Sequence, residues 1–479
     1  MNKKFYITTA IPYVNAPPHI GHALEFVQAD AIARFHKLLE EDVCLLSGAD
    51  ENALKNVQAA EKAGEDIQSF VDKNGKLFEN LAKKLNVCFD IFFKGSDQKR
   101  HFPSSQNLWR LCEKNSDIYK KTYEGLYCVG CETFYTKEDL NEKGECLEHP
   151  GRKLENVSEK NYFFKLSKYQ KQLIDLISSD QVKITPEAKK NEVLSFLKQS
   201  LLDISISRSN ERAKNWGVPV PNDPTQRIYV WFDALNIYQS GIGFGWDDNT
   251  YKKWWPADVH VIGKGIIRFH AVYWIAFLLS AKLKLPKEIF VHGYFTVNGQ
   301  KMSKTLGNVI DPFEMVEKYG VDSIRYYLLR EIPSYSDGDF SETRFKELYN
   351  ADLANGLGNL IARVGKLAEK AQGIRHKTQV KLRIQNYEEY NNLFFQYRFN
   401  EILAWIWEKV TEQNRYIDSK EPWKLSGKAL EEVLEYSIEK ILEIAFLLQP
   451  FLPETSEKII QLFTAEEIKT IPPLFPRIK

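Results

Sequence analysis

The chain has 479 residues, of which 43% are hydrophobic and 27% charged, and its formal net charge is +1. This length predicts two to four structural units, and this balance is typical of a soluble globular protein. A near-neutral total neither supports nor excludes a nucleic-acid partner, because local charge patches attract such partners.

No stretch of the sequence predicts a membrane span or a secreted disulfide scaffold. The most apolar candidate, 271–283, is shorter than the roughly 20 residues that cross a bilayer. The N-terminal stretch is broken by threonines and prolines and makes a poor signal peptide. Six cysteines are too few for a disulfide framework in a chain of this length. We therefore expect a cytoplasmic protein without a membrane partner.

The first elements predict a doubly wound parallel sheet. Residues 5–11 form a β-rich run, a turn with proline and glycine follows, and residues 21–39 carry apolar side chains at helical spacing. Residues 43–48 form a second run typical of a buried strand. Strand, turn, helix and strand open a Rossmann-type fold of the α/β class, whose ligands lie beyond the carboxyl ends of the strands.

An insertion is expected to split this sheet. Residues 111–224 are rich in lysine and glutamate and end in a run studded with proline. Strand-like runs then return at 228–232, 258–262 and 288–291. From about residue 351 amphipathic helical patterns replace the strand signals, which predicts an all-α helical bundle at the end of the chain.

The first chemical signal is the turn that contains His19, Gly21 and His22, between the first strand and the first helix. The glycine lets the main chain approach a ligand, and the helix N-terminus offers N–H groups and a positive dipole end to phosphate. His19 and His22 can donate to phosphate oxygens without carrying a full charge. Two histidines around one glycine are equally compatible with a structural role.

The second signal is a glycine-containing loop that holds Lys301, Met302, Ser303 and Lys304 and precedes a helix predicted after Pro312. Two lysines three residues apart suit a clamp on a triphosphate, because compact cations can follow charge that moves onto a leaving pyrophosphate. A solvated surface loop is the commoner explanation of a single pattern of this kind.

The insertion contains Cys128, Cys131, Cys146 and His149, spaced C-x2-C-x14-C-x2-H. Two such pairs supply four ligands for tetrahedral Zn2+, and three thiolates with one imidazole make a closed structural site. The alternative is a set of unconnected residues in a charged loop. We predict one structural zinc ion per chain.

Together the two signals, HIGH and KMSKT, resemble the paired signature of the class I aminoacyl-tRNA synthetases, usually written HIGH and KMSKS. The resemblance implies activation of an amino acid by ATP with Mg2+, followed by transfer to tRNA. It gives catalytic roles to four residues, which are His19, His22, Lys301 and Lys304. It places ATP against these four and against Gly21, Gly263, Met302 and Ser303.

One segment departs from the family pattern. Residues 260–270 resemble the stretch GKD and the following helix, which cradle the ribose of the nucleotide. Gly265 stands where the family usually has aspartate, which removes a ribose acceptor.

Within the class, the sequence resembles the methionyl enzymes. The residues that match their amino-acid pocket are Ala10, Ile11, Tyr13, Trp231, Ala234, Tyr238 and His270. Aromatic rings make favourable contacts with a thioether, and Asp50 would hold the ammonium group of L-methionine. Core packing is the alternative for each ring. The leucyl, isoleucyl and valyl enzymes carry an editing insertion for which 111–224 is too short. Cysteinyl enzymes differ because their zinc reads the substrate.

The resemblance extends into the helical bundle. Residues 355–363 resemble the anticodon-reading helix and residues 421–423 the aromatic platform that follows it. Asn359 and Arg363 would then hydrogen-bond anticodon bases of tRNA(Met), and Trp423 would stack on one base. The default explanation of the Asn/Arg pair is that both are polar side chains on the protein surface without a binding role. The sequence carries no extra oligonucleotide-binding domain of the kind that dimerises some relatives, so we expect a monomer.

The resemblance also implies a division of the chain. Residues 1–110 and 225–320 would form the two halves of the Rossmann catalytic domain, and 111–224 the connective insertion with the zinc knuckle. Residues 321–350 would be a stem-contact linker and 351–479 the anticodon-binding domain.

Two other functional classes remain open. A small nucleotidyltransferase has a similar HIGH-like turn, but the helical bundle and the zinc insertion argue against it. A catalytically inactive tRNA-binding relative is disfavoured because HIGH and KMSKT are both intact.

Overall fold

The centre of the molecule is a parallel sheet. Its strands are β1 (Lys4–Thr9), β2 (Asp42–Ala49), β3 (Ile91–Lys94), β7 (Lys183–Thr185), β12 (Val259–Gly263) and β13 (Glu288–His292). They lie in the order β3-β2-β1-β12-β13-β7, and each neighbouring pair is parallel. The direction of winding reverses between β1 and β12, and open α/β sheets bind ligands at such a switch point. The α/β class with a parallel sheet is confirmed.

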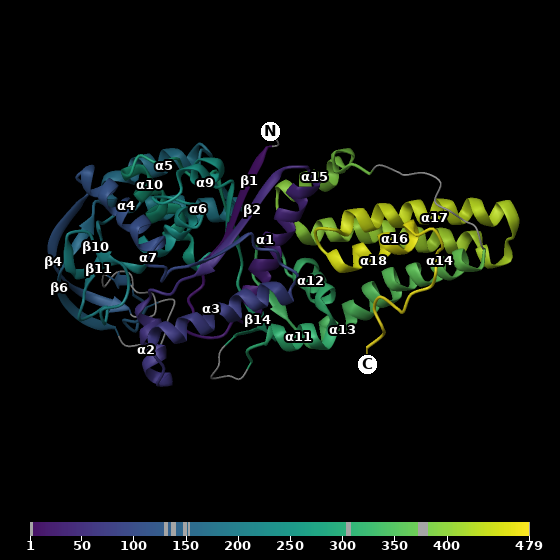
Figure 1. Cartoon of the computed structure of the whole chain (residues 1–479), viewed down its shortest axis with the longest axis horizontal. Coiled ribbons are helices and arrows are strands. Elements are labelled where there is room, and N and C mark those ends of the chain that lie inside the picture. The colour runs from purple at the N-terminus through teal and green to yellow at the C-terminus, as the bar shows by residue number, and fades with distance from the viewer. Residues whose placement is uncertain are drawn as a thin grey trace.

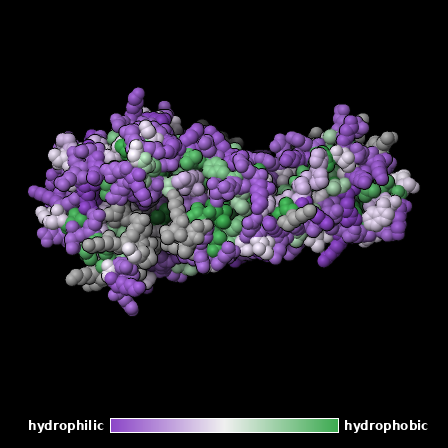
Figure 2. Space-filling model, turned by 90° about the horizontal axis from the view of Figure 1, so that it is seen from below, coloured by the Kyte–Doolittle hydropathy of each residue, from purple (hydrophilic) through white to green (hydrophobic). Residues whose placement is uncertain are grey.

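The computed structural model describes residues 3–128, 133–135, 140–146, 151, 154–302, 308–371 and 382–478. These residues form an elongated molecule in which the sheet lies near the middle and a bundle of helices extends to one side (Figure 1). Hydrophilic residues cover most of the face drawn in Figure 2. No helix among the described residues combines the length and apolar character that crossing a bilayer requires.

Helix α1 (Ile20–Leu38) connects β1 to β2. Within the stretch 21–39, whose apolar spacing predicts a helix, Ala23, Val27, Ala31 and Phe35 form one stripe, and all four are buried. The register of the two strands runs from Lys4 opposite Asp42 to Thr8 opposite Leu46. The N-terminus of α1 therefore lies at the carboxyl edge of the sheet, beside the switch point.

The range predicted as an insertion contributes both to a separate antiparallel layer and to the main sheet. Strands β4 (Ile118–Cys128), β5 (Thr133–Tyr135), β6 (Glu155–Phe164) and β8 (Ile204–Ser205) form a sheet in the order β5-β4-β6-β8. A smaller sheet has the order β10-β11-β9, with β9 (Ser207–Ser209), β10 (Pro219–Val220) and β11 (Asp223–Ile228). β7 instead joins the parallel sheet at its edge, where Lys183 lies opposite Glu288.

The strand predicted at 228–232 is wrong. β11 ends at Ile228, and α7 (Val230–Leu235) begins two residues later. The main-chain N–H of Asp233 donates to the Tyr229 carbonyl at 3.1 Å, as in a helical turn. Residues 228–232 are all buried, and a short run of buried residues has the same pattern in a strand and in an enclosed helix.

The remaining elements complete the two parts of the molecule. The other helices of the α/β part are α2 (Leu54–Ala63), α3 (Ile67–Lys84), α4 (His101–Lys114), α5 (Gln170–Ser178), α6 (Glu187–Leu197), α8 (Ile237–Ser240), α9 (Asp248–Trp254), the π-helix η4 (Phe269–Trp274) and α10 (Ile275–Ser280). A third sheet has the order β15-β14-β16, with β14 (Phe295–Val297), β15 (Gln300–Lys301) and β16 (Gly338–Phe340). It leads into α11 (Pro312–Tyr319), α12 (Val321–Arg330) and α13 (Glu342–Leu348).

The last part of the described chain is helical, as predicted. It comprises the π-helix η6 (Tyr349–Gly358), α14 (Asn359–Lys370), α15 (Glu388–Phe395), α16 (Phe399–Lys420), the short turn η8 (Pro422–Lys424), α17 (Gly427–Leu448) and α18 (Pro453–Thr464). Figure 1 shows α14, α16, α17 and α18 side by side, extending away from the sheet. Their apolar faces belong to the same buried core as α1 and β1.

A buried arginine joins the two parts. The guanidinium of Arg325 on α12 is fully buried and lies 2.7 Å from the Asp30 carboxylate on α1. It also donates to the carbonyls of Leu85, Pro450 and Phe451 at 3.1, 2.9 and 2.8 Å. One side chain therefore satisfies acceptors from α1, from the end of α3 and from the turn between α17 and α18.

Candidate active site

The turn from β1 into α1 is held by its two histidines. His19 is the N-cap of α1, and its Nδ1 accepts from the main-chain N–H of Gly21 at 3.1 Å. The Nδ1 of His22 accepts from the N–H of His19, also at 3.1 Å, so the two side chains form a reciprocal capping box. In a neutral ring whose Nδ1 accepts, Nε2 carries the hydrogen and is a donor. Burial lowers the pKa of His22 well below its usual value, so this residue is a neutral donor at pH 7.

Gly21 allows a close approach at this turn. A Cβ atom built on Gly21 would lie 2.9 Å from Cε1 of His19, a distance that real Cβ atoms do not show. The same position is 3.7 Å from Cε of Met302. The N–H of Ile20 donates to the carbonyl of Ile310 at 3.3 Å. The structure therefore brings Met302, within the second signature segment, and Ile310, which follows it, to the N-terminus of α1.

The second segment leaves the sheet through a tight hairpin. Asn298 and Gly299 both have positive φ, as the central residues of such a turn require. They connect β14 to β15, in which Lys301 lies opposite Thr296. The main chain of Lys301 is described, and Ser303 and Lys304 lie outside the described residues.

Packing just after β12 explains why this chain has Gly265 where the family pattern has aspartate. A Cβ atom built on Gly265 would lie 1.9 Å from the hydroxyl oxygen of Tyr294, so no other residue fits here without moving that ring. Lys264 lies over the ring of Tyr294 at 4.6 Å and pairs with Asp337 at 2.7 Å. The tyrosine hydroxyl thus occupies the space beside Gly265 where an aspartate side chain would begin.

The aromatic candidates for the amino-acid pocket lie together. The indole of Trp231 on α7 meets the rings of Tyr13 and His270 edge-on, each at 6.2 Å, and stacks on Phe269 at 3.8 Å. Tyr238 on α8 lies 2.8 Å from Nε2 of His270 through its hydroxyl. These residues come from three segments far apart in the sequence.

Hydrogen bonds define which ring nitrogen of His270 carries the hydrogen. Its Nδ1 lies 2.9 Å from the carbonyl of Ile266, which can only accept, so Nδ1 carries the hydrogen and Nε2 accepts from the Tyr238 hydroxyl. Burial lowers the pKa of His270 to about 4, which keeps the ring neutral. An uncharged wall suits the side chain of an apolar thioether.

The remaining pocket candidates lie at the carboxyl edge of the sheet. Ala10 and Ile11 follow β1 and are half-buried, and Ala234 is buried on α7. Asp50 directly follows β2 and is bridged to Tyr13 in parallel register. Its N–H donates to the carbonyl of Pro12 at 2.9 Å, which holds the main chain of Asp50 beside that of Tyr13.

Sequence reasoning missed two residues here. Glu25, on α1 one turn after His22, accepts from the N–H of Ala10 at 2.9 Å. Its other oxygen lies 2.9 Å from Nε2 of His292, the last residue of β13. The helical spacing of Glu25 from His22 was the available signal for the first, and none pointed to the second.

The candidate anticodon residues occupy one region of the helical bundle. Arg363 on α14 lies 5.8 Å from the ring centroid of Trp423 and pairs with Asp418 at 2.5 Å. Asn359 is exposed one helical turn before Arg363. The Trp423 ring is 53% exposed, which is unusual for a large apolar side chain and excludes a core role.

Two of the four predicted zinc ligands are described. Cys128 ends β4, and Cys146 forms a bridge with Leu140; both are buried. Cys131 and His149 lie outside the described residues, and the described part of the chain contains no group of three or more side chains that could hold a metal ion. One buried thiol at the end of β4 and another at an isolated bridge are compatible with a closed structural site.

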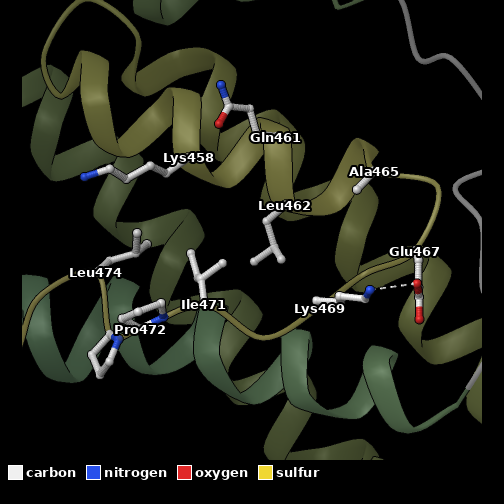
Figure 3. A pocket seen from close by; sticks show the side chains of 10 residues that line it. Lys458, Gln461, Leu462, Ala465, Glu467, Lys469, Ile471, Pro472 and Leu474 are labelled. Carbon is white, nitrogen blue, oxygen red and sulfur yellow. Dashed lines mark ion pairs between the residues drawn. The ribbon is translucent and has the colours of Figure 1, made fainter.

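A groove of about 530 Å3 lies away from this site, between α18 and the segment that follows it (Figure 3). Its apolar floor includes Leu462, Ile471 and Leu474, and Lys469 pairs with Glu467 at 3.1 Å on its rim. None of the predicted site residues lines it. The groove therefore has no part in the chemistry of the sheet edge.

Residues 5–365 match the family model described as tRNA synthetases class I (M). The chain is 42% identical to a methionine–tRNA ligase of Thermotoga maritima, over 97% of this chain and 76% of the relative. It is 40% identical to a methionine–tRNA ligase of Brucella melitensis, over 97% and 92%. Mycobacterium tuberculosis methionyl-tRNA synthetase in complex with methionyl-adenylate has a similar fold, with a TM-score of 0.92, 36% identity, and coverage of 99% of this chain and 100% of that one. The chain therefore belongs to the class I (M) family of tRNA synthetases.

Proposed function

We propose that this protein activates L-methionine with ATP, forming methionyl-adenylate and pyrophosphate, and then transfers methionine to the 3' end of its tRNA. One structural observation carries the proposal. The capped histidine turn, Met302 and Ile310 meet at the N-terminus of α1, and Tyr13, which contacts Trp231, lies at the same carboxyl edge of the sheet. The family and the named relatives point to the same activity.

In the first step, the methionine carboxylate attacks the α-phosphate of ATP in line. Positioning and charge stabilisation supply the catalysis, so the protein needs no nucleophile of its own. His19 and His22 donate through Nε2 to phosphate oxygens, and Lys301 and Lys304 neutralise the departing pyrophosphate. Gly21 and Gly263 allow ATP to approach the main chain, with Met302 and Ser303 beside it. Mg2+ would enter with ATP, whose phosphate oxygens would serve as its ligands.

Methionine lies with its thioether against Tyr13, Trp231, Tyr238 and the neutral ring of His270, and its ammonium group on Asp50. Ala10, Ile11 and Ala234 complete the pocket. In the second step the terminal ribose hydroxyl of the tRNA attacks the carbonyl carbon of the adenylate, an ester forms, and AMP leaves. Asn359, Arg363 and Trp423 read the anticodon at the far end of the helical bundle.

The test is pyrophosphate exchange measured with each of the twenty amino acids in turn. Methionine alone is expected to support exchange of labelled pyrophosphate into ATP. Exchange with a different amino acid would reject the proposed substrate, and no exchange with any would favour a tRNA-binding protein without activity.

Trp423→Ala is expected to weaken aminoacylation of tRNA by about 1–3 kcal/mol, the usual contribution of base–aromatic stacking. Methionine-dependent exchange needs no tRNA, so it should be nearly unchanged. The matched control is Trp407→Ala, because Trp407 is buried in the same bundle and pairs with Tyr326 at 4.4 Å. That change should cost about 3–5 kcal/mol of stability and reduce both activities. Parallel loss of both activities in the Trp423 variant would reject the stacking role.

We also propose one structural zinc ion per chain, held by Cys128, Cys131, Cys146 and His149. Three thiolates and one imidazole leave no open position, so zinc stabilises the insertion without taking part in the reaction. Elemental analysis of the purified protein should find about one zinc per chain. Folded and active protein without metal would be the contrary result.

We propose further that the protein acts in the cytoplasm as a monomer. Size-exclusion chromatography with light scattering tests the monomeric state directly, and the mass of a dimer would reject it.

A further inference from the structure

Glu25 spans the switch point of the sheet. Ala10 follows β1, and His292 ends β13; β12 lies between the two strands. Strands β1 and β13 are therefore about 10 Å apart at this edge. The two carboxylate oxygens of Glu25 reach both, with 2.9 Å to the N–H of Ala10 and 2.9 Å to Nε2 of His292.

The hydrogen bonds of His292 locate one of its ring protons. Nδ1 of His292 lies 2.8 Å from the carbonyl of Gly293, which only accepts, so Nδ1 carries a hydrogen. Nε2 faces a carboxylate and must also donate if Glu25 is ionised. Both side chains are nearly buried, at 7% and 12% exposure, so water competes little for the hydrogen bond that joins them.

The pair touches both proposed substrate positions. Ala10 belongs to the methionine side of the site. On the nucleotide side, a Cβ atom built on Gly263 would lie 3.6 Å from Cε1 and 3.7 Å from Nε2 of His292. Since Glu25 is on α1, it also ties these two positions to the helix whose N-terminus carries His19 and His22.

We propose that Glu25 and His292 are positioning residues for adenylate formation, which set the distance between the methionine carboxylate and the α-phosphate by joining β1, α1 and β13 across β12. The inference rests on the proposed function. Neither side chain needs to touch the reacting atoms. In a reaction catalysed by positioning, an error of about 1 Å costs up to about 100-fold in rate.

Two substitutions of Glu25 separate the effect of its side-chain length from the effect of its charge. Glu25→Gln keeps the length of the side chain: its oxygen can accept from Ala10, and its amide can donate to a neutral His292. Glu25→Asp keeps the charge but is shorter by one methylene, about 1.5 Å, so it cannot reach both partners. The positioning role requires a side chain long enough to contact both partners and does not require a negative charge.

The chain offers a matched control in a second buried His–Glu pair at the other end of α1. Nδ1 of His36 lies 2.6 Å from Glu41, and both side chains are below 10% exposed. His36 is eleven residues after Glu25, about 16 Å along the helix axis. Glu41→Asp should therefore reproduce any general loss of stability without moving the sheet edge.

The experiment measures methionine-dependent pyrophosphate exchange and the melting temperature of the whole protein and these three variants. Glu25→Asp is expected to lower kcat by about 10- to 100-fold, with a smaller change in either KM, while Glu25→Gln and Glu41→Asp stay within about threefold. An active Glu25→Asp, an inactive Glu25→Gln, or equal losses in Glu25→Asp and Glu41→Asp would overturn the inference. Absence of exchange in the unsubstituted protein would reject the proposed function as well, so the two failures are distinguishable.

Discussion

Lys301→Ala is expected to slow formation of methionyl-adenylate by about 100- to 1,000-fold, the usual cost of removing one group that stabilises transition-state charge. Negative charge grows on the pyrophosphate only as it departs. The lysine therefore stabilises the transition state more than it stabilises the complex with bound methionine. The KM for methionine should change little. The hairpin of β14 and β15 supports this placement, because Met302, the next residue, lies beside Gly21.

Single-turnover measurement of adenylate formation checks this expectation without interference from product release. The control is Lys318→Ala on nearby α11, where the lysine is 58% exposed and pairs with Glu342 at 2.8 Å. Exposed pairs of this kind contribute little, so the control should behave as the unsubstituted protein. A rate for Lys301→Ala within about threefold of the control would contradict the role of this lysine as a clamp on the phosphates.

Arg325→Met is expected to destabilise the protein by about 3–5 kcal/mol, because it removes one of the two guanidinium groups that pair with the buried Asp30 carboxylate and the donor to three main-chain carbonyls. Asp30 would retain Arg34 at 2.7 Å but lose the guanidinium that lies equally close. The carbonyls of Pro450 and Phe451 would lose their donor within the core. The contact between α1 and the helical bundle should therefore weaken first.

The shift in the midpoint of urea unfolding measures this loss. Arg344→Met is the control, since Arg344 is 47% exposed and pairs with Glu331 at 2.8 Å. Its removal should cost no more than about 1 kcal/mol. Equal shifts for the two variants would show that the Arg325 contacts add nothing beyond an ordinary surface pair.

The sequence was sufficient wherever a feature depends on near neighbours in the chain. The buried stripe of α1, from Ala23 to Phe35, follows from helical spacing, and α11 begins at Pro312 as predicted. The parallel sheet followed from the order of strand, turn, helix and strand. The family was readable because its two signature segments are short and contiguous.

The prediction at 228–232 failed because periodicity cannot separate a buried helix from a buried strand. α7 takes its helical form from packing between α4, the core around Phe277 and the aromatic group of the site, where Phe232 lies 5.7 Å from Trp109 and 4.6 Å from Phe277. Likewise nothing local marks β7 as an edge strand of the main sheet, because its partner β13 is about a hundred residues later.

Contacts between distant segments were decided by the tertiary structure alone. Glu25 and His292 are 267 positions apart, and they meet because β12 places the ends of β1 and β13 at one edge. Gly265 lies against Tyr294 because β13 runs parallel to β12 and ends at His292, opposite Gly263, two residues before this tyrosine. Spacing in a sequence constrains the conformation of a segment, whereas the partner of a buried polar group depends on which strands the packing of the whole chain makes adjacent.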